Sequence, residues 1–181
     1  LFDACAQAGV QRVVHISALG IDGSNTRYAQ TKRAAEAHLQ TLATQAKLRP
    51  AILRPSVVYG KGGDSSALFM NLARLPLALF PGPMLTARVQ PVSVHDLAAA
   101  VVALLGPALQ HTGTIECTGP EALTMGAFIA SLRQQLGHSP ATVLRLPQPL
   151  TTLSARLGDA VPQSPWCSET LAMLGSDNVG N

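Results

Sequence analysis

The sequence is poor in charge. Only 13% of its 181 residues are Asp, Glu, Lys or Arg, and the formal net charge is +3. No run of Lys and Arg forms the basic face that a DNA- or RNA-binding protein presents to phosphates. The composition therefore gives no electrostatic case for a nucleic-acid partner.

Cysteine is also scarce, and its placement argues against two kinds of site. Cys5, Cys117 and Cys167 lie far apart, without a Cys-x-x-Cys pair or a histidine at metal-ligand spacing. We therefore expect neither a metal site nor a disulfide framework. Free thiols are typical of a reducing compartment, so the predicted location is cytoplasmic.

Long apolar runs are absent too. The longest, LAAAVVALL, ends at Gly106 and is far shorter than the roughly 20 residues that span a bilayer, so it predicts a buried helix. Hydrophobic residues still make up 47% of the sequence, which is enough for one globular domain with a sizeable core. The chain starts LFDACAQAGVQRVV, without Met and within an apparent helix that Gly9 closes, so we expect it to begin inside a domain.

The pattern in the first third of the chain predicts parallel strands. RVVHIS is a short β-branched run, a helix is expected from about Thr26 to Lys47, and Ala51–Pro55 is a second buried strand. A helical crossover of this length joins parallel strands, and strands without polar alternation belong to a sheet covered on both faces. The predicted fold class is therefore α/β, as the C-terminal part of a Rossmann-like, doubly wound parallel sheet.

The rest of the chain is less regular. We expect a helix from Ser65 to Leu75, an irregular excursion through LPLALFPGPM, and a strand at Val89–Val94. A helix then starts at His95-Asp96, with Asp96 as its cap, and Thr114–Cys117 forms a strand. Thr124 is expected to cap a helix that Gly137 closes, and a further helix lies near Leu150–Leu157. The expected division is a sheet domain at 1–118, with its excursion at about 65–94, and a small, mainly helical substrate-side region and tail at 119–181.

One short stretch carries chemistry: RYAQTK places Tyr28 and Lys32 four residues apart on one face of a predicted helix. A phenol with a pKa near 10 is a poor base at neutral pH. An ammonium one helical turn away would stabilise the phenolate and lower that pKa, so that the pair could exchange a proton with an alcohol or carbonyl. The pair alone is a common pattern, and the alternative is a half-buried tyrosine on a helix.

The surrounding segments make the pattern more specific. In order, VVHISALG, the RYAQTK helix, LRPSVVYGKG and QPVSVHDLAAAVVALL resemble the extended short-chain dehydrogenase/reductase family, that is, the NAD-dependent epimerase/dehydratase family, over nearly the whole chain. HISALG and MLGSDNV most resemble its atypical branch, related to the nucleotide-binding accessory subunit of mitochondrial complex I. The resemblance implies a NAD or NADP cofactor and an unknown small-molecule substrate.

The resemblance also implies roles for individual residues. Tyr28 would be the acid/base, and Lys32 would hold the nicotinamide ribose hydroxyls while lowering the tyrosine pKa. Pro55, Ser56 and Val57 would line the nicotinamide, with main-chain groups near its carboxamide.

Ser17 falls near the position of the hydroxyl that orients the substrate carbonyl. The sequence continues Ser17-Ala18-Leu19 where extended members have consecutive Ser or Thr, and Ser17 stands one or two positions early. Two functions therefore remain open. One is an oxidoreductase or epimerase, and the other is a structural or regulatory protein that holds a nucleotide without turning it over.

The glycine-rich dinucleotide loop of this family, Gly-x-x-Gly-x-x-Gly, is missing. Gly60, Gly62 and Gly63 are too closely spaced for it, so GKGGD is interpreted as a turn. We expect that the first part of the domain, about four strands, lies outside this chain. An incomplete sheet has an open edge through which this chain could self-associate. A weaker alternative is membrane-surface association through ALFPGPML.

Two further polar residues have open interpretations. His15 lies within a predicted strand, where a core or edge position is more common than a ligand role. Arg54, near the end of the second strand, could contact a phosphate in the complete protein or form a structural ion pair.

Overall fold

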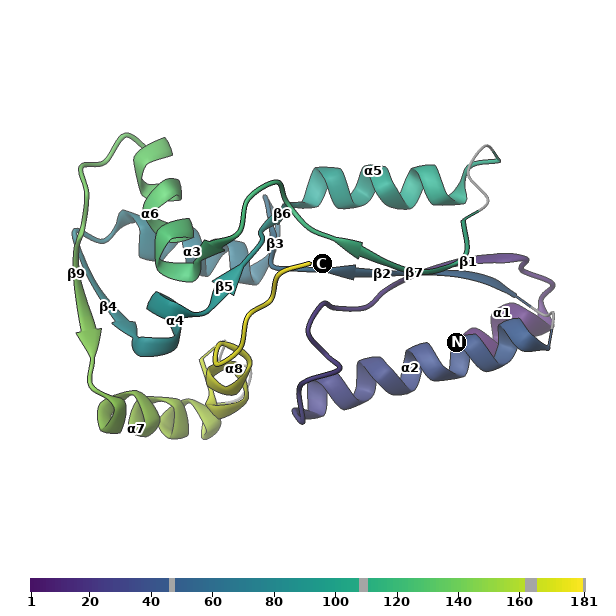
Figure 1. The fold of residues 1–181 in the computed structure, drawn as a ribbon, viewed down its shortest axis with the longest axis horizontal. Coiled ribbons are helices and arrows are strands. Elements are labelled where there is room, and N and C mark those ends of the chain that lie inside the picture. Colours follow the sequence, from purple (N-terminus) through teal and green to yellow (C-terminus); the bar gives the residue numbers. More distant parts are fainter. Residues whose placement is uncertain (46–47, 108–110, 162–165, 181) are drawn as a thin grey trace.

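The structure is a computed structural model that describes residues 1–45, 48–107, 111–161 and 166–180. Two groups of elements follow one another along the long axis of the molecule (Figure 1). We call the group around the three-stranded sheet the sheet half, and the group that contains the C-terminal helices the small half.

The sheet half is a parallel sheet in the order β1-β2-β7. Its strands are β1 (Arg12–Ile16), β2 (Arg49–Pro55) and β7 (Gly113–Cys117). The helices are α1 (Phe2–Gln7), α2 (Arg27–Thr44) and α5 (Val94–Leu105). α1 and α2 lie on one face of the sheet and α5 on the other (Figure 1), which is the predicted doubly wound arrangement.

Alternate strand residues fill the two faces of the sheet. Val14 and Ile16 of β1 pack with Leu53 and Leu97 in the cluster beneath α5. Val13 points the other way and packs with the cluster of Leu39, Leu42 and Leu48 beneath α2. Because successive strand side chains alternate between faces, a strand covered on both sides needs apolar residues on both, as Val13 and Val14 illustrate.

Side-chain caps fix the starts of α2 and α5, the two long helices of the sheet half. Thr26 Oγ1 accepts a hydrogen bond from the Ala29 N–H at the start of α2. The helix ends at Thr44, before the predicted end, and residues 46–47 lie outside the described residues. The cap of α5 is Ser93, whose Oγ accepts from the His95 N–H, so the assignment of Asp96 as the cap was wrong. Asp96 instead lies in the first turn, where its charge favours the helix N-terminus.

The small half contains pairings that the sequence did not indicate. Its sheets are two-stranded: β3 with β6, β4 with β9, and β5 with β8. The strands are β3 (Val58–Tyr59), β4 (Leu77–Pro81), β5 (Arg88–Val89), β6 (Val92–Ser93), β8 (Leu123–Thr124) and β9 (Thr142–Leu146). The helices are α3 (Asp64–Arg74), α4 (Gly82–Thr86), α6 (Met125–Gln135), α7 (Gln148–Asp159) and α8 (Ser168–Met173).

Two expectations about this half were wrong for physical reasons. LPLALFPGPM is not irregular: it forms β4 and α4, because β4 finds a parallel partner in β9 far along the chain. The single strand expected at Val89–Val94 is split at Pro91, and its two parts join different sheets. Proline cannot donate to a ladder, which explains the break.

The small half has its own core. Phe69, Ala73 and Phe80 pack there with Phe128 and Ile129 of α6. The segment expected as an excursion therefore shares a core with the C-terminal region. Phe80 and Met84 belong to this core, so the ALFPGPML segment does not offer them to a membrane surface.

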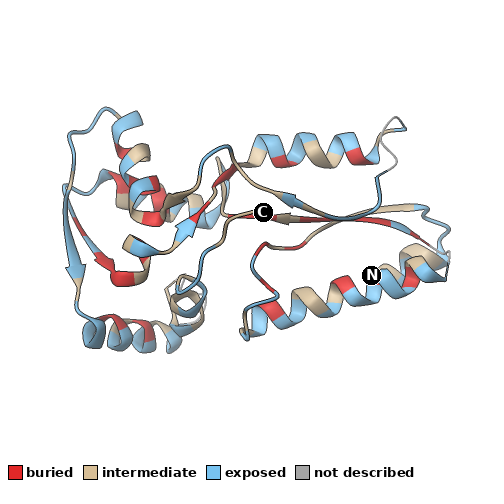
Figure 2. Cartoon of the chain, in the orientation of Figure 1, coloured by how far each residue is buried: buried red, intermediate tan, exposed pale blue. Residues whose placement is uncertain are grey.

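The surface shows where the fold is open. Among the described residues β1 pairs only with β2, so its other edge is unpaired. Figure 2 shows exposed residues along the outside of α7 and β9. Within the described part of the chain, no helix has both the length and the apolar character that a membrane crossing requires.

Candidate functional site

The predicted Tyr-Lys pair lies at the N-terminal end of α2, beside the carboxyl end of β1. The Lys32 Nζ lies 5.7 Å from the centre of the Tyr28 ring. The same ammonium donates a hydrogen bond of 2.9 Å to the Ile16 carbonyl, the last of β1. Both side chains are thus on one helix face, as predicted, and Lys32 is fixed to the sheet.

The environment of Tyr28 differs from the expectation in one respect. The residue is 39% exposed, and burial raises its pKa above the ordinary value of 10.0. The predicted lowering of the Tyr28 pKa by Lys32 is therefore not seen: the shift is upward, and its cause is the burial of the ring. The Tyr28 N–H donates to Glu169 Oε1 of α8 at 2.9 Å, so the small half reaches the first turn of α2.

Ser17 is placed away from solvent. It directly follows β1, is 3% exposed, and faces the α2 side of the sheet beside Glu36. Its Oγ has no partner of ordinary hydrogen-bond geometry in the described part of the chain, although its proximity helps to lower the pKa of the Glu36 carboxyl. In this position the hydroxyl does not meet a ligand from solvent.

The three residues predicted to line the nicotinamide lie at the end of β2, and their polar groups are engaged. The Pro55 carbonyl accepts from Leu19 N, and the Val57 carbonyl accepts from Val92 N. Ser56 is buried, and its Oγ donates to the Asn178 carbonyl at 2.7 Å and accepts from Gln90 N. These bonds hold the end of β2 against the segments beside it.

Arg54 forms the structural ion pair rather than standing free for a phosphate. It donates two hydrogen bonds to Glu36 of α2 and two to Asp22 of the loop that precedes α2. Burial favours the neutral form of Glu36, but the hydrogen bonds and charge of Arg54 prevail and hold the Glu36 pKa below its ordinary value. The hydrogen bond to Glu36 is the main cause that raises the Arg54 pKa.

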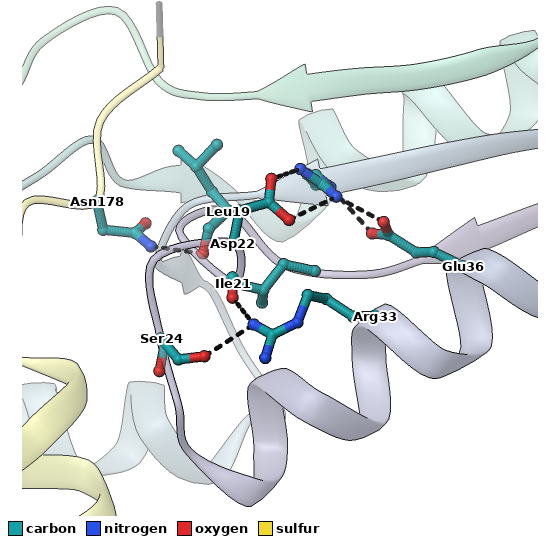
Figure 3. Close-up of polar contacts among 8 residues, drawn as sticks. Leu19, Ile21, Asp22, Ser24, Arg33, Glu36 and Asn178 are labelled. Carbon is teal, nitrogen blue, oxygen red and sulfur yellow. Dashed lines mark hydrogen bonds and ion pairs between the residues drawn. The ribbon is translucent and has the colours of Figure 1, made fainter.

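The same loop is held from two other directions (Figure 3). Arg33 of α2 donates from Nη1 to the carbonyls of Ile21 and Ser24. Asn178, near the end of the chain, donates from Nδ2 to the Leu19 carbonyl at 2.8 Å. The segment after β1 is therefore held at its backbone by side chains from α2 and the C-terminal segment. Arg54 of β2 holds it at the Asp22 carboxylate.

Asn178 and Glu169 are contacts that sequence reasoning missed. MLGSDNV was noticed only for its resemblance to a family branch, and no residue in it was assigned a role. Both residues lie far from Tyr28 along the chain, so no local sequence pattern indicated these contacts.

His15 is a half-buried strand residue whose ring packs edge-on against Phe2. Its pKa is lowered, first by burial and then by the charge of Lys32.

A cavity of about 630 Å³ lies beside α3, away from the predicted site residues. Its lining includes the turn Gly60–Asp64, and none of the predicted site residues belongs to it. Gly60 and Gly62 have φ of +151° and +98°, which agrees with GKGGD as a turn. Among the described residues, no group of His, Cys, Asp and Glu is arranged to hold a metal ion.

The sequence model of the NAD dependent epimerase/dehydratase family matches residues 1–115. None of the curated proteins matches the chain. Several solved structures do match, and three illustrate the likeness.

A UDP-glucose 4-epimerase from Thermus thermophilus, in complex with NAD, is 20% identical with a TM-score of 0.64, over 97% of this chain and 67% of that one. A UDP-N-acetylglucosamine 4-epimerase from Methanobrevibacter ruminantium is 18% identical with a TM-score of 0.63, over 81% and 53%. DesIV, a dTDP-glucose 4,6-dehydratase from Streptomyces venezuelae with NAD and TYD bound, is 21% identical with a TM-score of 0.63, over 81% and 50%.

At these identities the likeness concerns the fold, and it confirms the predicted Rossmann-like α/β class. The chain spans between half and about two thirds of the length of these three structures.

Proposed function

The chain belongs to the NAD dependent epimerase/dehydratase family, and from this premise we propose that it carries the proton-transfer and nicotinamide-side part of an NAD(P)-dependent oxidoreductase or epimerase. The observation that carries the proposal is the position of Tyr28 and Lys32 together at the carboxyl end of β1. Ligands of open α/β sheets bind beyond this end of the strands.

The residues present fit the nicotinamide end of a dinucleotide. An ammonium has three donors, and the Ile16 carbonyl takes one from Lys32, which leaves donors for the ribose hydroxyls. Pro55, Ser56 and Val57 would line the nicotinamide ring. The cofactor, when bound, supplies a hydride acceptor or donor. The chain contains no glycine-rich loop for the pyrophosphate.

Tyr28 would transfer the proton at its hydroxyl. With a pKa above the ordinary value of 10.0, the phenol holds its proton at neutral pH and can donate it to a carbonyl oxygen as that carbonyl accepts hydride. Proton removal from an alcohol would need additional stabilisation of the phenolate, for which Lys32 is the nearby cation.

The second candidate is a protein of the complex I accessory subunit type, which holds the nucleotide without turnover. The burial of Ser17 and the presence of Ala18 and Leu19 after it favour this alternative. No hydroxyl side chain from these three positions would then orient a substrate carbonyl. The known relatives act on nucleotide sugars according to their names, but the fold alone does not assign that substrate class here.

The two tyrosines of the chain provide a matched test in the full-length protein. Tyr28→Phe should lower turnover of NADH or NADPH with a responsive carbonyl or nucleotide-sugar substrate by about 10² to 10⁴, because the general acid is lost. Binding of NADH or NADPH, followed by nucleotide fluorescence, should change little. Tyr59→Phe is the control, since the Tyr59 ring packs against Phe128 in the small half.

Unchanged turnover in Tyr28→Phe would show that Tyr28 is not the acid/base. Tight NADH or NADPH binding by the wild-type protein without turnover of any tested carbonyl or alcohol would favour the second candidate.

A further inference from the structure

The C-terminal segment Asp177–Gly180 joins regions that are far apart in the sequence. The Asn178 Nδ2 donates to the Leu19 carbonyl at 2.8 Å, and the Asn178 carbonyl accepts from Ser56 Oγ at 2.7 Å. One residue therefore links the loop after β1 to the residue after β2. Ser56 lies in the segment to which the proposed function assigns the nicotinamide, and Leu19 lies two residues after Ser17, for which the family resemblance implied a role beside the substrate.

The contact with the loop after β1 is close. Gly20 has φ of +75°, a conformation that favours glycine, and a Cβ at this position would lie 3.0 Å from Asn178 Nδ2. The loop backbone thus packs directly on the Asn178 amide, as Figure 3 shows for Leu19. Because no side chain separates the Asn178 amide from this backbone, the amide can determine where the backbone lies.

The segment is attached independently of the Asn178 side chain. Asn178 forms a parallel bridge with Val89 of β5, and its N–H donates to the Arg88 carbonyl at 2.7 Å. Asp177 Oδ1 accepts from Arg88 N, and Gly180 N donates to Gln90 Oε1. A change confined to the Asn178 amide therefore leaves the segment in place, and its effect reports on the link to Leu19.

The amide is not fully satisfied. Asn178 Oδ1 is buried and has no hydrogen-bond partner among the described residues. A buried acceptor without a partner costs stability, so packing alone does not explain an asparagine at this position. Residues whose polar groups lack hydrogen-bond partners are commonly found at functional sites.

We propose that Asn178 is a positioning residue of the nicotinamide site, whose amide N–H group holds the loop after β1 at a fixed distance from Ser56. The proposal rests on the proposed function, because it assigns Asn178 to that same site. It makes the C-terminal segment part of the site, although Asn178 acts on the backbone of Leu19 and not on a ligand.

The test is Asn178→Asp in the full-length protein. This change keeps the shape of the side chain but replaces the donor that faces the Leu19 carbonyl by an acceptor. Asn71→Asp makes the same chemical change at an exposed position of α3 and serves as the control. Two measurements are made on each: hydrogen exchange of residues 17–24 without ligand, and kcat and KM for NADH or NADPH oxidation.

We expect exchange of residues 17–24 to rise by about tenfold in Asn178→Asp and to stay unchanged in the control. We expect kcat to fall by about tenfold to a hundredfold, with a smaller change in the nucleotide KM, because the ligand-facing segments lose alignment. A protonated carboxyl regains a donor, so the kcat deficit should shrink as the pH is lowered. A loss of kcat caused by altered packing alone does not predict this pH-dependent recovery.

Unchanged exchange and unchanged kcat in Asn178→Asp would overturn the proposal, as would a loss of kcat that does not recover at low pH. If the wild-type protein binds neither NADH nor NADPH, the proposed function fails, and Asn178 is then not a positioning residue of a nicotinamide site. The exchange measurement needs no nucleotide, so it shows separately whether the Asn178 amide holds the loop after β1.

Discussion

The two halves of the molecule differ in how far the leucine side chains of their helices are buried. In the sheet half, Leu39 of α2 is fully buried against the sheet. In the small half, α7 turns Thr151 and Ala155 inward, while Leu150, Leu153 and Leu157 are each more than half exposed. A helix between sheet and solvent is stabilised by an inward apolar stripe, whereas α7 packs through small residues. Leucine content alone therefore does not identify the core face of a helix in this chain.

The largest effect expected within this comparison is the loss of a buried leucine. Leu39→Ala should lower the free energy of unfolding by about 2–5 kcal/mol, because it leaves a cavity among Leu42, Leu48 and Val13. Leu157→Ala makes the same change at a position that is 64% exposed, and should alter that free energy by less than about 0.5 kcal/mol. Urea unfolding of both variants measures the difference.

Similar losses in the two variants would show that the Leu157 side chain is covered in solution. That result would remove the contrast between the halves, since α7 would then bury its leucines as α2 does.

The same contrast explains what could be predicted from the sequence. β1, α2 and β2 follow one another directly, so apolar runs and the spacing of Tyr28 and Lys32 predicted the sheet half and the shared face of the pair. The β4 strand pairs with β9 across most of the small half, and Pro81 ends β4, so local signals indicated an irregular segment. Long-range pairing of this kind leaves no periodic pattern near either strand.

The candidate site was predicted where it depends on one helix, and missed where it depends on the fold. Tyr28 and Lys32 share a helix face whatever the rest of the chain does. The burial of Ser17 depends on the face to which it turns, and the contacts of Glu169 and Asn178 depend on how the chain returns from the small half. The family resemblance drew attention to the stretch MLGSDNV, but it did not indicate which residues Asn178 contacts.

A second prediction concerns the buried ion pair between Glu36 and Arg54 in the sheet half. Glu36→Gln should lower the free energy of unfolding at neutral pH by about 2 kcal/mol, because Arg54 loses its buried charged partner and keeps only the exposed Asp22. The exposed Glu121→Gln is the matched control. Urea unfolding at a series of pH values measures both.

The pH dependence has a definite sign. Since the folded pKa of Glu36 is held below its ordinary value of 4.5, the ionised group contributes stability above that value and loses it as the pH falls through the folded pKa. The difference between wild type and Glu36→Gln should therefore be largest near neutral pH and shrink below about pH 4.5. A constant difference across this range would argue against the ion pair as its cause.

The smallest expected effect lies at the contact between the halves. Glu169 of α8 accepts from the Tyr28 N–H in the first turn of α2, where a carboxylate also favours the helix dipole. Glu169→Ala should lower the free energy of unfolding by about 0.5–1 kcal/mol, which corresponds to about 2–4 °C per kcal/mol in Tm for a chain of this size. Glu169→Gln keeps an oxygen acceptor and should lose less, and added salt should narrow the gap between wild type and Glu169→Gln because it screens the dipole interaction. If both variants match the wild type, the Glu169 contact does not help to hold the two halves together, and the Asn178 contacts with Leu19 and Ser56 remain between them.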